Sequence, residues 1–175
     1  MQGKSNGFTL VELMLAMAIA IILMALLTPG LVRLVQNNRM SSLHNDLMSD
    51  LAIARSTSVT RGNYATLCAS NDAGTQCLPQ VIIWTNGWLV FDDKDNDGRI
   101  DTGEEILSSK NGISDRLKMF SNNPRVSFDP EGSAFGFATE FAFYDGRGND
   151  AKRGLIVSNS GRSRAAESSE ILVNC

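Results

Sequence analysis

A twelve-residue acidic segment near the middle of the chain has the spacing of a calcium-binding loop. Across 93–104, acidic side chains occupy the first, third, fifth, ninth and twelfth positions, and glycine occupies the sixth. In an EF-hand loop this pattern supplies carboxylate and backbone carbonyl oxygens to Ca²⁺, while the glycine permits a sharp turn. The candidate calcium ligands are Asp93, Asp95, Asp97, the backbone carbonyl of Arg99, Asp101 and Glu104.

The surroundings of this acidic segment disagree with an EF-hand. An EF-hand loop lies between two helices, whereas the residues before this one, 88–91, read Trp-Leu-Val-Phe and are typical of a β-strand. A solvated acidic turn between strands explains the segment as well, and the context favours it. Calcium remains the alternative, and we expect no other cofactor.

Cationic residues gather towards the C-terminus. The chain of 175 residues carries a formal net charge of -3, so its bulk charge does not predict a nucleic-acid partner. A local basic patch can still neutralise phosphates without reading bases, which gives salt-sensitive and sequence-independent DNA binding. A solvated loop face is the alternative. The candidate residues are Arg147, Lys152, Arg153, Arg162 and Arg164.

The three cysteines lie beyond the apolar N-terminal part of the chain. Cys68 and Cys77 are close in sequence and are the expected bridge in an oxidising compartment, contributing about 2–3 kcal/mol by chain entropy. The sequence leaves open whether Cys175 is free, joins another molecule or competes for Cys77. No nucleophile and base pair, metal-histidine cluster or phosphate loop is visible, so we do not expect an enzyme.

An apolar segment at the front of the chain is the element from which the others follow. Residues 8–28 are expected to span a membrane once, because a helix of this length is about 30 Å long and matches the hydrocarbon thickness. Glu12 is the ionised residue of this span and needs a partner there. A polar leader, 1–7, precedes the span, and the expected cut after Gly7 leaves the apolar segment in the mature protein.

The remaining chain changes from helical to strand periodicity. Apolar residues at helical spacing across 29–60 predict the amphipathic half of one long helix. Short apolar runs bounded by turn residues follow across 61–175, which we expect to form a single head domain. The fold class is therefore α+β, with an antiparallel sheet packed on the helix. We expect strands at 64–68, 81–84, 87–91, 125–128, 140–144, 154–158 and 170–173.

The residues at the start of the apolar segment resemble the class III signal of type IV pilins and type II secretion pseudopilins. Residues 7–12 read Gly-Phe-Thr-Leu-Val-Glu. The resemblance implies that a prepilin peptidase cuts after Gly7 and methylates the new N-terminal residue, Phe8. It also implies that the carboxylate of Glu12 sets the register against the next subunit, and that the fold is pilin-like.

Four further segments resemble the FimT/GspH group of minor pilins and pseudopilins, so the resemblance covers nearly the whole chain. The pilus-side FimT/FimU type is the closer one, because of the two-cysteine hairpin and the Gly-Arg-Ser-Arg motif at 161–164. The segments are 68–77, 84–91 with its acidic turn, 128–134 and 161–164.

This resemblance implies a minor pilin that acts in pilus assembly at the tip and captures DNA during natural transformation. Arg162 and Arg164 match the DNA-capture motif, and Lys152, Arg153 and Arg147 are added by proximity in sequence. The implied partners are other major and minor pilins, the prepilin peptidase, the inner-membrane assembly machinery and double-stranded DNA. The implied location is the bacterial inner membrane with the head in the periplasm, and then the pilus. The alternative is a GspH-type pseudopilin of a type II secretion system.

Overall fold

One long helix begins the chain in the computed structural model, which describes residues 7–80, 82–84, 86–113, 116–148 and 151–173. Helix α1 runs from Leu10 to Arg61. Thr9 caps its N-terminus, because the Thr9 Oγ1 atom accepts the Glu12 N–H at 3.3 Å. Gly62 ends the helix with a positive φ of 68°, which an L side chain rarely adopts.

The chain divides into two compact units, Met1–Arg39 and Met40–Cys175, which we describe separately. In the first unit, the large apolar side chains of α1 between Leu10 and Leu27 are exposed. By length and composition, α1 qualifies as a membrane-crossing helix. An exposed apolar surface of this extent is stable only against lipid or against other helices.

The second unit contains two four-stranded sheets in which all neighbouring strands are antiparallel. The first sheet has the order β3-β2-β1-β5 and the second has the order β4-β6-β7-β8. The strands are β1 (Ala65–Ala69), β2 (Gly87–Asp92), β3 (Ile106–Asn111), β4 (Leu117–Ser121), β5 (Arg125–Phe128), β6 (Thr139–Asp145), β7 (Arg153–Val157) and β8 (Ser163–Ala166).

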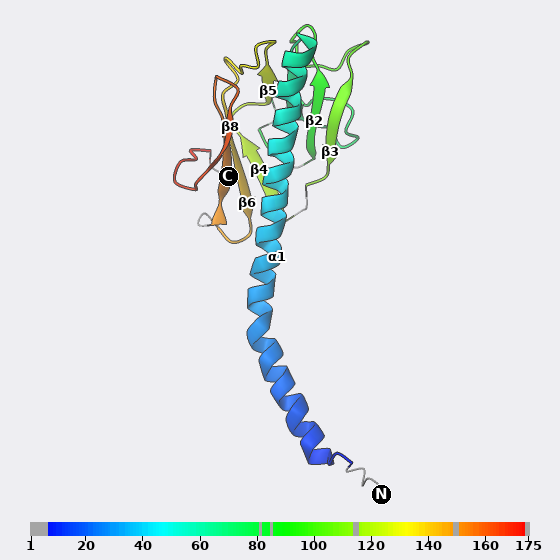
Figure 1. Ribbon diagram of the computed structural model, residues 1–175, viewed down its shortest axis with the longest axis vertical. Helices are drawn as coiled ribbons and strands as arrows, with labels where there is room; N and C mark the ends of the chain where they lie inside the picture. The colour runs from blue at the N-terminus through cyan, green and yellow to red at the C-terminus, as the bar shows by residue number, and fades with distance from the viewer. Residues whose placement is uncertain (1–6, 81, 85, 114–115, 149–150, 174–175) are drawn as a thin grey trace, which may run out of the picture. The chain divides into compact units, whose positions relative to one another are not determined.

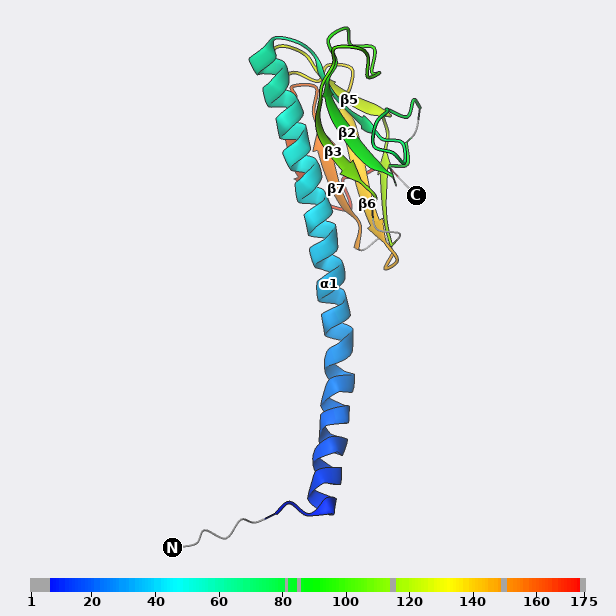
Figure 2. The same ribbon diagram turned by 90° about the vertical axis from the view of Figure 1, so that its right-hand side faces the viewer.

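A single apolar core joins the C-terminal part of α1 to both sheets. The strands β2 and β3 lie on one side of this part of the helix and β4, β6 and β8 on the other (Figure 1), and the turned view shows the helix covering one side of the strands (Figure 2). The helical spacing of the buried positions produces one apolar stripe. The buried residues of this stripe are Met40, Leu43, Leu47, Leu51 and Ala54.

The expected α+β class is confirmed, although the strands form two sheets instead of one. Five of the seven expected strands are present within one or two residues of their expected bounds. The expectation of a strand at 81–84 is wrong for the described residues 82–84, which bond to β4 only through an isolated bridge at Ile83 and adjoining backbone hydrogen bonds. The expectation at 170–173 is also wrong, because β8 already holds that sheet edge.

Three strands, β3, β4 and β8, were not expected from the sequence. Each lies at the edge of its sheet. Edge strands are partly solvated and carry polar side chains that protect the open edge, so they lack a continuous apolar run. Strand β3 reads Ile-Leu-Ser-Ser-Lys-Asn and strand β8 reads Ser-Arg-Ala-Ala, which are patterns of this kind.

A buried carboxylate connects α1 to the first sheet. The side chain of Asp50 is 8 % exposed, and its Oδ2 atom accepts the indole N–H of Trp88 at 2.6 Å. Its Oδ1 atom accepts the Ser108 hydroxyl at 2.7 Å. Because Trp88 lies on β2 and Ser108 on β3, one helical side chain binds two neighbouring strands. Both hydrogen bonds involve a charged acceptor, which makes them stronger than neutral ones.

We expect replacement of this carboxylate to destabilise the second unit. Asp50→Ala leaves the buried Trp88 N–H without an acceptor, at a cost of about 1–3 kcal/mol in the free energy of unfolding. Asp46→Ala is the matched control, since it removes a partly exposed ion pair with Lys110 and should cost below about 1 kcal/mol. Chemical denaturation of the full chain in detergent measures both values, and equal losses in the two variants would contradict the assigned role of Asp50.

Candidate functional site

The N-terminal motif places its polar groups at the first turn of α1. Gly7 and Phe8 lie immediately before the helix and are exposed. Thr9 is the capping residue and Glu12 is the third residue of the helix, which is the spacing of a capping box. A carboxylate in the first turn also lies at the positive end of the helix dipole. Glu12 therefore has a local structural role besides any contact with a neighbouring subunit.

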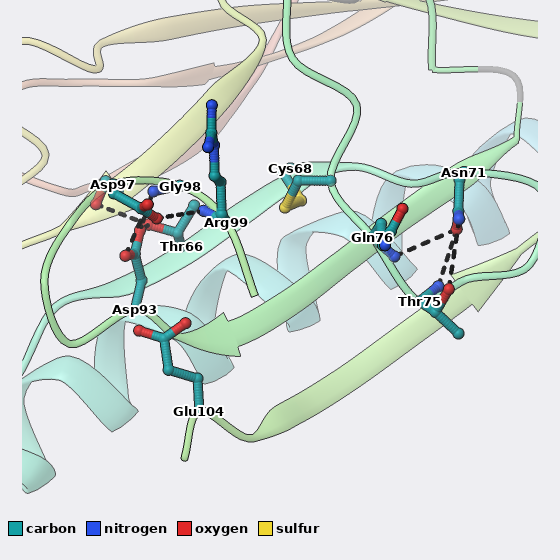
Figure 3. The surroundings of a disulfide bond; sticks show 12 residues. Thr66, Cys68, Asn71, Thr75, Gln76, Asp93, Asp97, Gly98, Arg99 and Glu104 are labelled. Atoms are coloured by element: carbon teal, nitrogen blue, oxygen red, sulfur yellow. Dashed lines mark hydrogen bonds between the residues drawn. A yellow bond between two sulfur atoms is a disulfide. The ribbon is translucent and has the colours of Figure 1, made fainter. Parts of the chain in front are cut away.

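Three of the expected calcium ligands are close together at one turn. Oxygen atoms of Asp93, Asp95 and Asp97 lie within 4.8 Å of one another, and Asp93 is buried whereas the other two are exposed. The Asp93 Oδ2 atom accepts the Thr66 hydroxyl at 2.6 Å and the Gly98 N–H at 3.2 Å. Figure 3 shows this turn beside the disulfide. Burial raises the pKa of the Asp93 carboxyl, and the hydrogen bonds from Thr66 and Gly98 oppose that change.

Glu104 and Asp101, which were also expected to bind calcium, lie outside this cluster of three aspartates. Glu104 accepts the backbone N–H of Lys94 at 2.8 Å and of Asp101 at 3.0 Å, so its two oxygens stabilise the loop itself. The guanidinium of Arg125 donates to the carbonyl of Asn96 at 3.2 Å and brings a positive charge to the turn. Of the expected carboxylate ligands, those of Asp93, Asp95 and Asp97 therefore form the cluster.

The disulfide joins Cys68, at the end of β1, to Cys77. The Cα atoms of the two residues are 5.6 Å apart, which is usual for a disulfide. Within the closed loop, the side-chain oxygen of Asn71 accepts the backbone N–H groups of Thr75 and Gln76, at 2.9 and 3.3 Å (Figure 3). The question of Cys175 lies outside the described residues.

The structure separates the five cationic residues that the sequence grouped together. Arg153 begins β7, and Arg162 lies in the turn between β7 and β8, so these two side chains are at opposite ends of the same hairpin. Arg153 donates to the Ser41 hydroxyl at 2.8 Å. Arg162 is exposed and forms no ion pair within the described part of the chain.

The other three cationic side chains already have protein partners. Arg147 pairs with Asp145. Lys152 is 9 % exposed, and its ammonium group donates to the Ile171 carbonyl at 3.0 Å. Arg164 binds both carboxylate oxygens of Glu170, at 2.9 and 3.2 Å. The hydrogen bond from Arg164 lowers the pKa of the Glu170 carboxyl.

Lys152 and Arg164 hold the C-terminal segment 167–173 on the outer face of the second sheet. Ile171 is buried there beside Ala142 and Tyr144. The Tyr144 hydroxyl donates to the Val173 carbonyl at 2.8 Å. A Cβ atom at Gly154 would overlap the end of the Ile171 side chain, so a larger residue at this position would displace Ile171. Lys152 and Arg164 therefore have structural roles that the sequence did not indicate.

The glycine of the Gly-Arg-Ser-Arg motif fixes the position of Arg162. Gly161 has a φ of 72°, and a Cβ atom there would overlap the carbonyl oxygen of Gly132. Arg55 of α1 donates to this carbonyl at 2.9 Å and to the carbonyl of Ser160 at 3.2 Å. Sequence reasoning missed Arg55, because its partners are 77 and 105 residues away and no local pattern marks such contacts.

Comparisons with known proteins agree with this architecture. The family model described as type II transport protein GspH matches residues 44–161, and the prokaryotic N-terminal methylation motif matches residues 3–28. The chain is 28% identical over 173 residues to the pilin-like protein PilA1 of Thermus thermophilus, covering 91% of this chain and 97% of that protein.

The fold is similar to that of the type IV minor pilin FimU of Pseudomonas aeruginosa in two crystal forms. The TM-scores are 0.57 and 0.54 at 20% and 21% sequence identity. These matches cover 78% and 74% of this chain, and 94% of the FimU chain in each case. At these identities the likeness shows the fold alone.

The family match spans more than half of the chain, and the methylation motif falls on the start of the apolar helix. Together the motif and the exposed apolar helix fit a membrane-anchored pilin. The chain therefore belongs to the GspH family and is a pilin-like protein of the type IV minor pilin and pseudopilin group.

Proposed function

We propose that this chain is a minor pilin of a type IV pilus that acts in fibre assembly at the tip and in DNA capture, with no catalytic activity. A prepilin peptidase removes the leader after Gly7 and methylates Phe8, and the exposure of both residues supports access by that enzyme. The chain is then a single-pass protein of the inner membrane with its head in the periplasm, before it enters the pilus.

Assembly would bury the exposed apolar side chains between Leu10 and Leu27 against the helices of other pilins. In lipid the gain comes from close packing and from polar contacts between helices. The carboxylate of Glu12 would then select the register, because a neighbour in the wrong register leaves this charge unpaired.

The observation that carries the DNA part of the proposal is the exposed guanidinium of Arg162 on a turn that Gly161 and Arg55 hold in place. A side chain presented on a fixed turn loses little further conformational freedom when it binds a phosphate. Arg153 is a second exposed cation, but it lies at the opposite end of the hairpin and its guanidinium donates to the Ser41 hydroxyl. Arg147, Lys152 and Arg164 contribute less, since their charged groups already bind protein atoms.

We infer that the acidic segment 93–104 is a structural turn without bound calcium. The support is that Glu104 binds backbone N–H groups and that Arg125 already supplies positive charge at the turn. Calcium takes six to eight oxygen ligands, and the clustered aspartates provide carboxylates from three residues.

We expect the charge of Glu12 to be required for incorporation into pili. Glu12→Gln keeps the size and the capping ability of the side chain but removes the charge, so incorporation should fall by about tenfold or more. The amount of the protein in sheared pilus fractions measures this effect, and Glu12→Asp is the control that retains a carboxylate. Circular dichroism of the purified variants should show unchanged helix content.

Normal incorporation of Glu12→Gln would contradict the register role. A deletion strain separates the pilus from the alternative: loss of protein secretion with normal pili would instead favour a GspH-type pseudopilin of a type II secretion system.

We expect Arg162 to contribute more to DNA binding than Arg164. In fluorescence anisotropy with the full chain in nonionic detergent, Arg162→Gln should weaken binding to labelled DNA and lower the slope of affinity against salt by about one. Arg164→Gln should have a smaller effect, because Glu170 already neutralises this guanidinium. Glu170→Gln should strengthen binding by releasing Arg164. No measurable DNA binding at low salt would contradict DNA capture and leave the assembly role.

We expect calcium to leave the stability of the head unchanged. At about 1 mM calcium, which is the weak end of the range for extracellular calcium modules, the melting temperature should equal that in EDTA. A rise that disappears in Asp95→Asn would support the calcium alternative. Asp72→Asn, which alters an exposed aspartate outside the acidic cluster, is the control.

A further inference from the structure

An exposed aromatic side chain stands on the loop between β5 and β6. Phe135 is 80 % exposed, the most exposed aromatic residue of the described head. The Phe137 N–H donates to the Ala134 carbonyl at 3.0 Å, and Gly136 between them has a φ of 82°. These are the features of a type II turn with phenylalanine at its second position and glycine at its third. The turn directs an apolar ring into solvent at a place where the core gains nothing from it.

Backbone contacts join this loop to the turn that carries Arg162. The Ala134 N–H donates to the Asn159 carbonyl at 2.9 Å. At the other end of the loop, Gly132 contacts Gly161, and Arg55 holds both turns. The two loops lie at the same end of the head, beside the last turns of α1 (Figure 1).

Inside the loop, the carboxyl group of Asp129 already accepts hydrogen bonds from the backbone. Its Oδ1 atom accepts the N–H groups of Glu131 and Ser133, at 3.0 and 2.8 Å. Glu131 is exposed and is the negative side chain that a bound anion would meet on this loop. The surface formed by both loops, which we call the loop end, thus offers one ring, one free guanidinium and one carboxylate.

We propose that the loop end binds single-stranded DNA, with a base stacked on Phe135 and a neighbouring phosphate bound by Arg162. The inference rests on the proposed DNA-capture function, and it differs from the double-stranded partner that the resemblance implies, because it assigns an unpaired strand to this site. The observations that carry it are that Phe135 and Arg162 are both exposed and stand on two loops joined by backbone contacts. Proteins bind unpaired strands without reading their sequence by combining aromatic rings, which stack on bases, with cations, which bind phosphates.

A duplex uses this pair of groups less well. In double-stranded DNA each base face is covered by the next base pair, so the ring of Phe135 has no surface to stack on unless a base leaves the helix, which costs a few kcal/mol. Phosphates are equally available in both forms. Arg162 alone would therefore bind either form, and Phe135 makes the difference between them.

The experiment compares three labelled probes of equal length on the full chain in nonionic detergent: a thymidine strand, an abasic strand and a duplex. The abasic strand keeps the phosphates and lacks the bases. We expect the thymidine strand to bind about tenfold more tightly than the abasic strand. Phe135→Ala should remove this difference without changing the affinity for the abasic strand, and Phe135→Trp should preserve it.

Two charge variants separate stacking from electrostatics. Arg162→Gln should weaken binding to all three probes, and Glu131→Gln should strengthen it, while neither variant changes the ratio between the thymidine and abasic strands. Equal affinity for those two strands, a preference for the duplex or an unaltered ratio in Phe135→Ala would overturn the inference while the DNA-capture function stands. Failure of all three probes to bind the wild-type chain would overturn both.

Discussion

The buried stripe of α1 is the constraint on which the head depends. Two separate four-stranded sheets share one apolar core, and the helical residues from Met40 to Ala54 are part of that core. Without the helix, the apolar faces of both sheets would lose their cover, at about 25 cal/mol for each Å² exposed to water. Asp50 makes this packing specific, because its hydrogen bonds to Trp88 and Ser108 favour one position of the helix on the first sheet.

The distribution of charge in the C-terminal part illustrates how folding and binding compete for the same side chains. A chain with a net charge of -3 needs a local patch to meet an anion, yet folding occupies most of the local cations. Lys152 and Arg164 hold the segment 167–173, whereas the side chain of Arg162 is exposed at its turn. Position in the hairpin, rather than residue type, decides which arginine is available to a ligand.

The sequence predicted the features that depend on local patterns. The long helix, the N-terminal motif and the buried strands β1, β2, β5, β6 and β7 are all marked by periodicity or spacing. The edge strands β3, β4 and β8 were missed because their partly solvated sequences resemble those of loops. Contacts made by Arg55 and Asp50 were missed because they join residues far apart in the sequence. The number of cations available to a ligand was overestimated for a related reason. Their carboxylate and carbonyl partners come close to them only when the chain is folded.

The position of Ile171 over Gly154 also bears on the order of folding. Ile171 packs over a face that is formed when β7 pairs with β6 and β8, so we expect the segment 167–173 to dock after these strands have paired. Until then, Tyr144 and Ala142 would remain exposed to water on that face, and docking of the segment buries them together with Ile171.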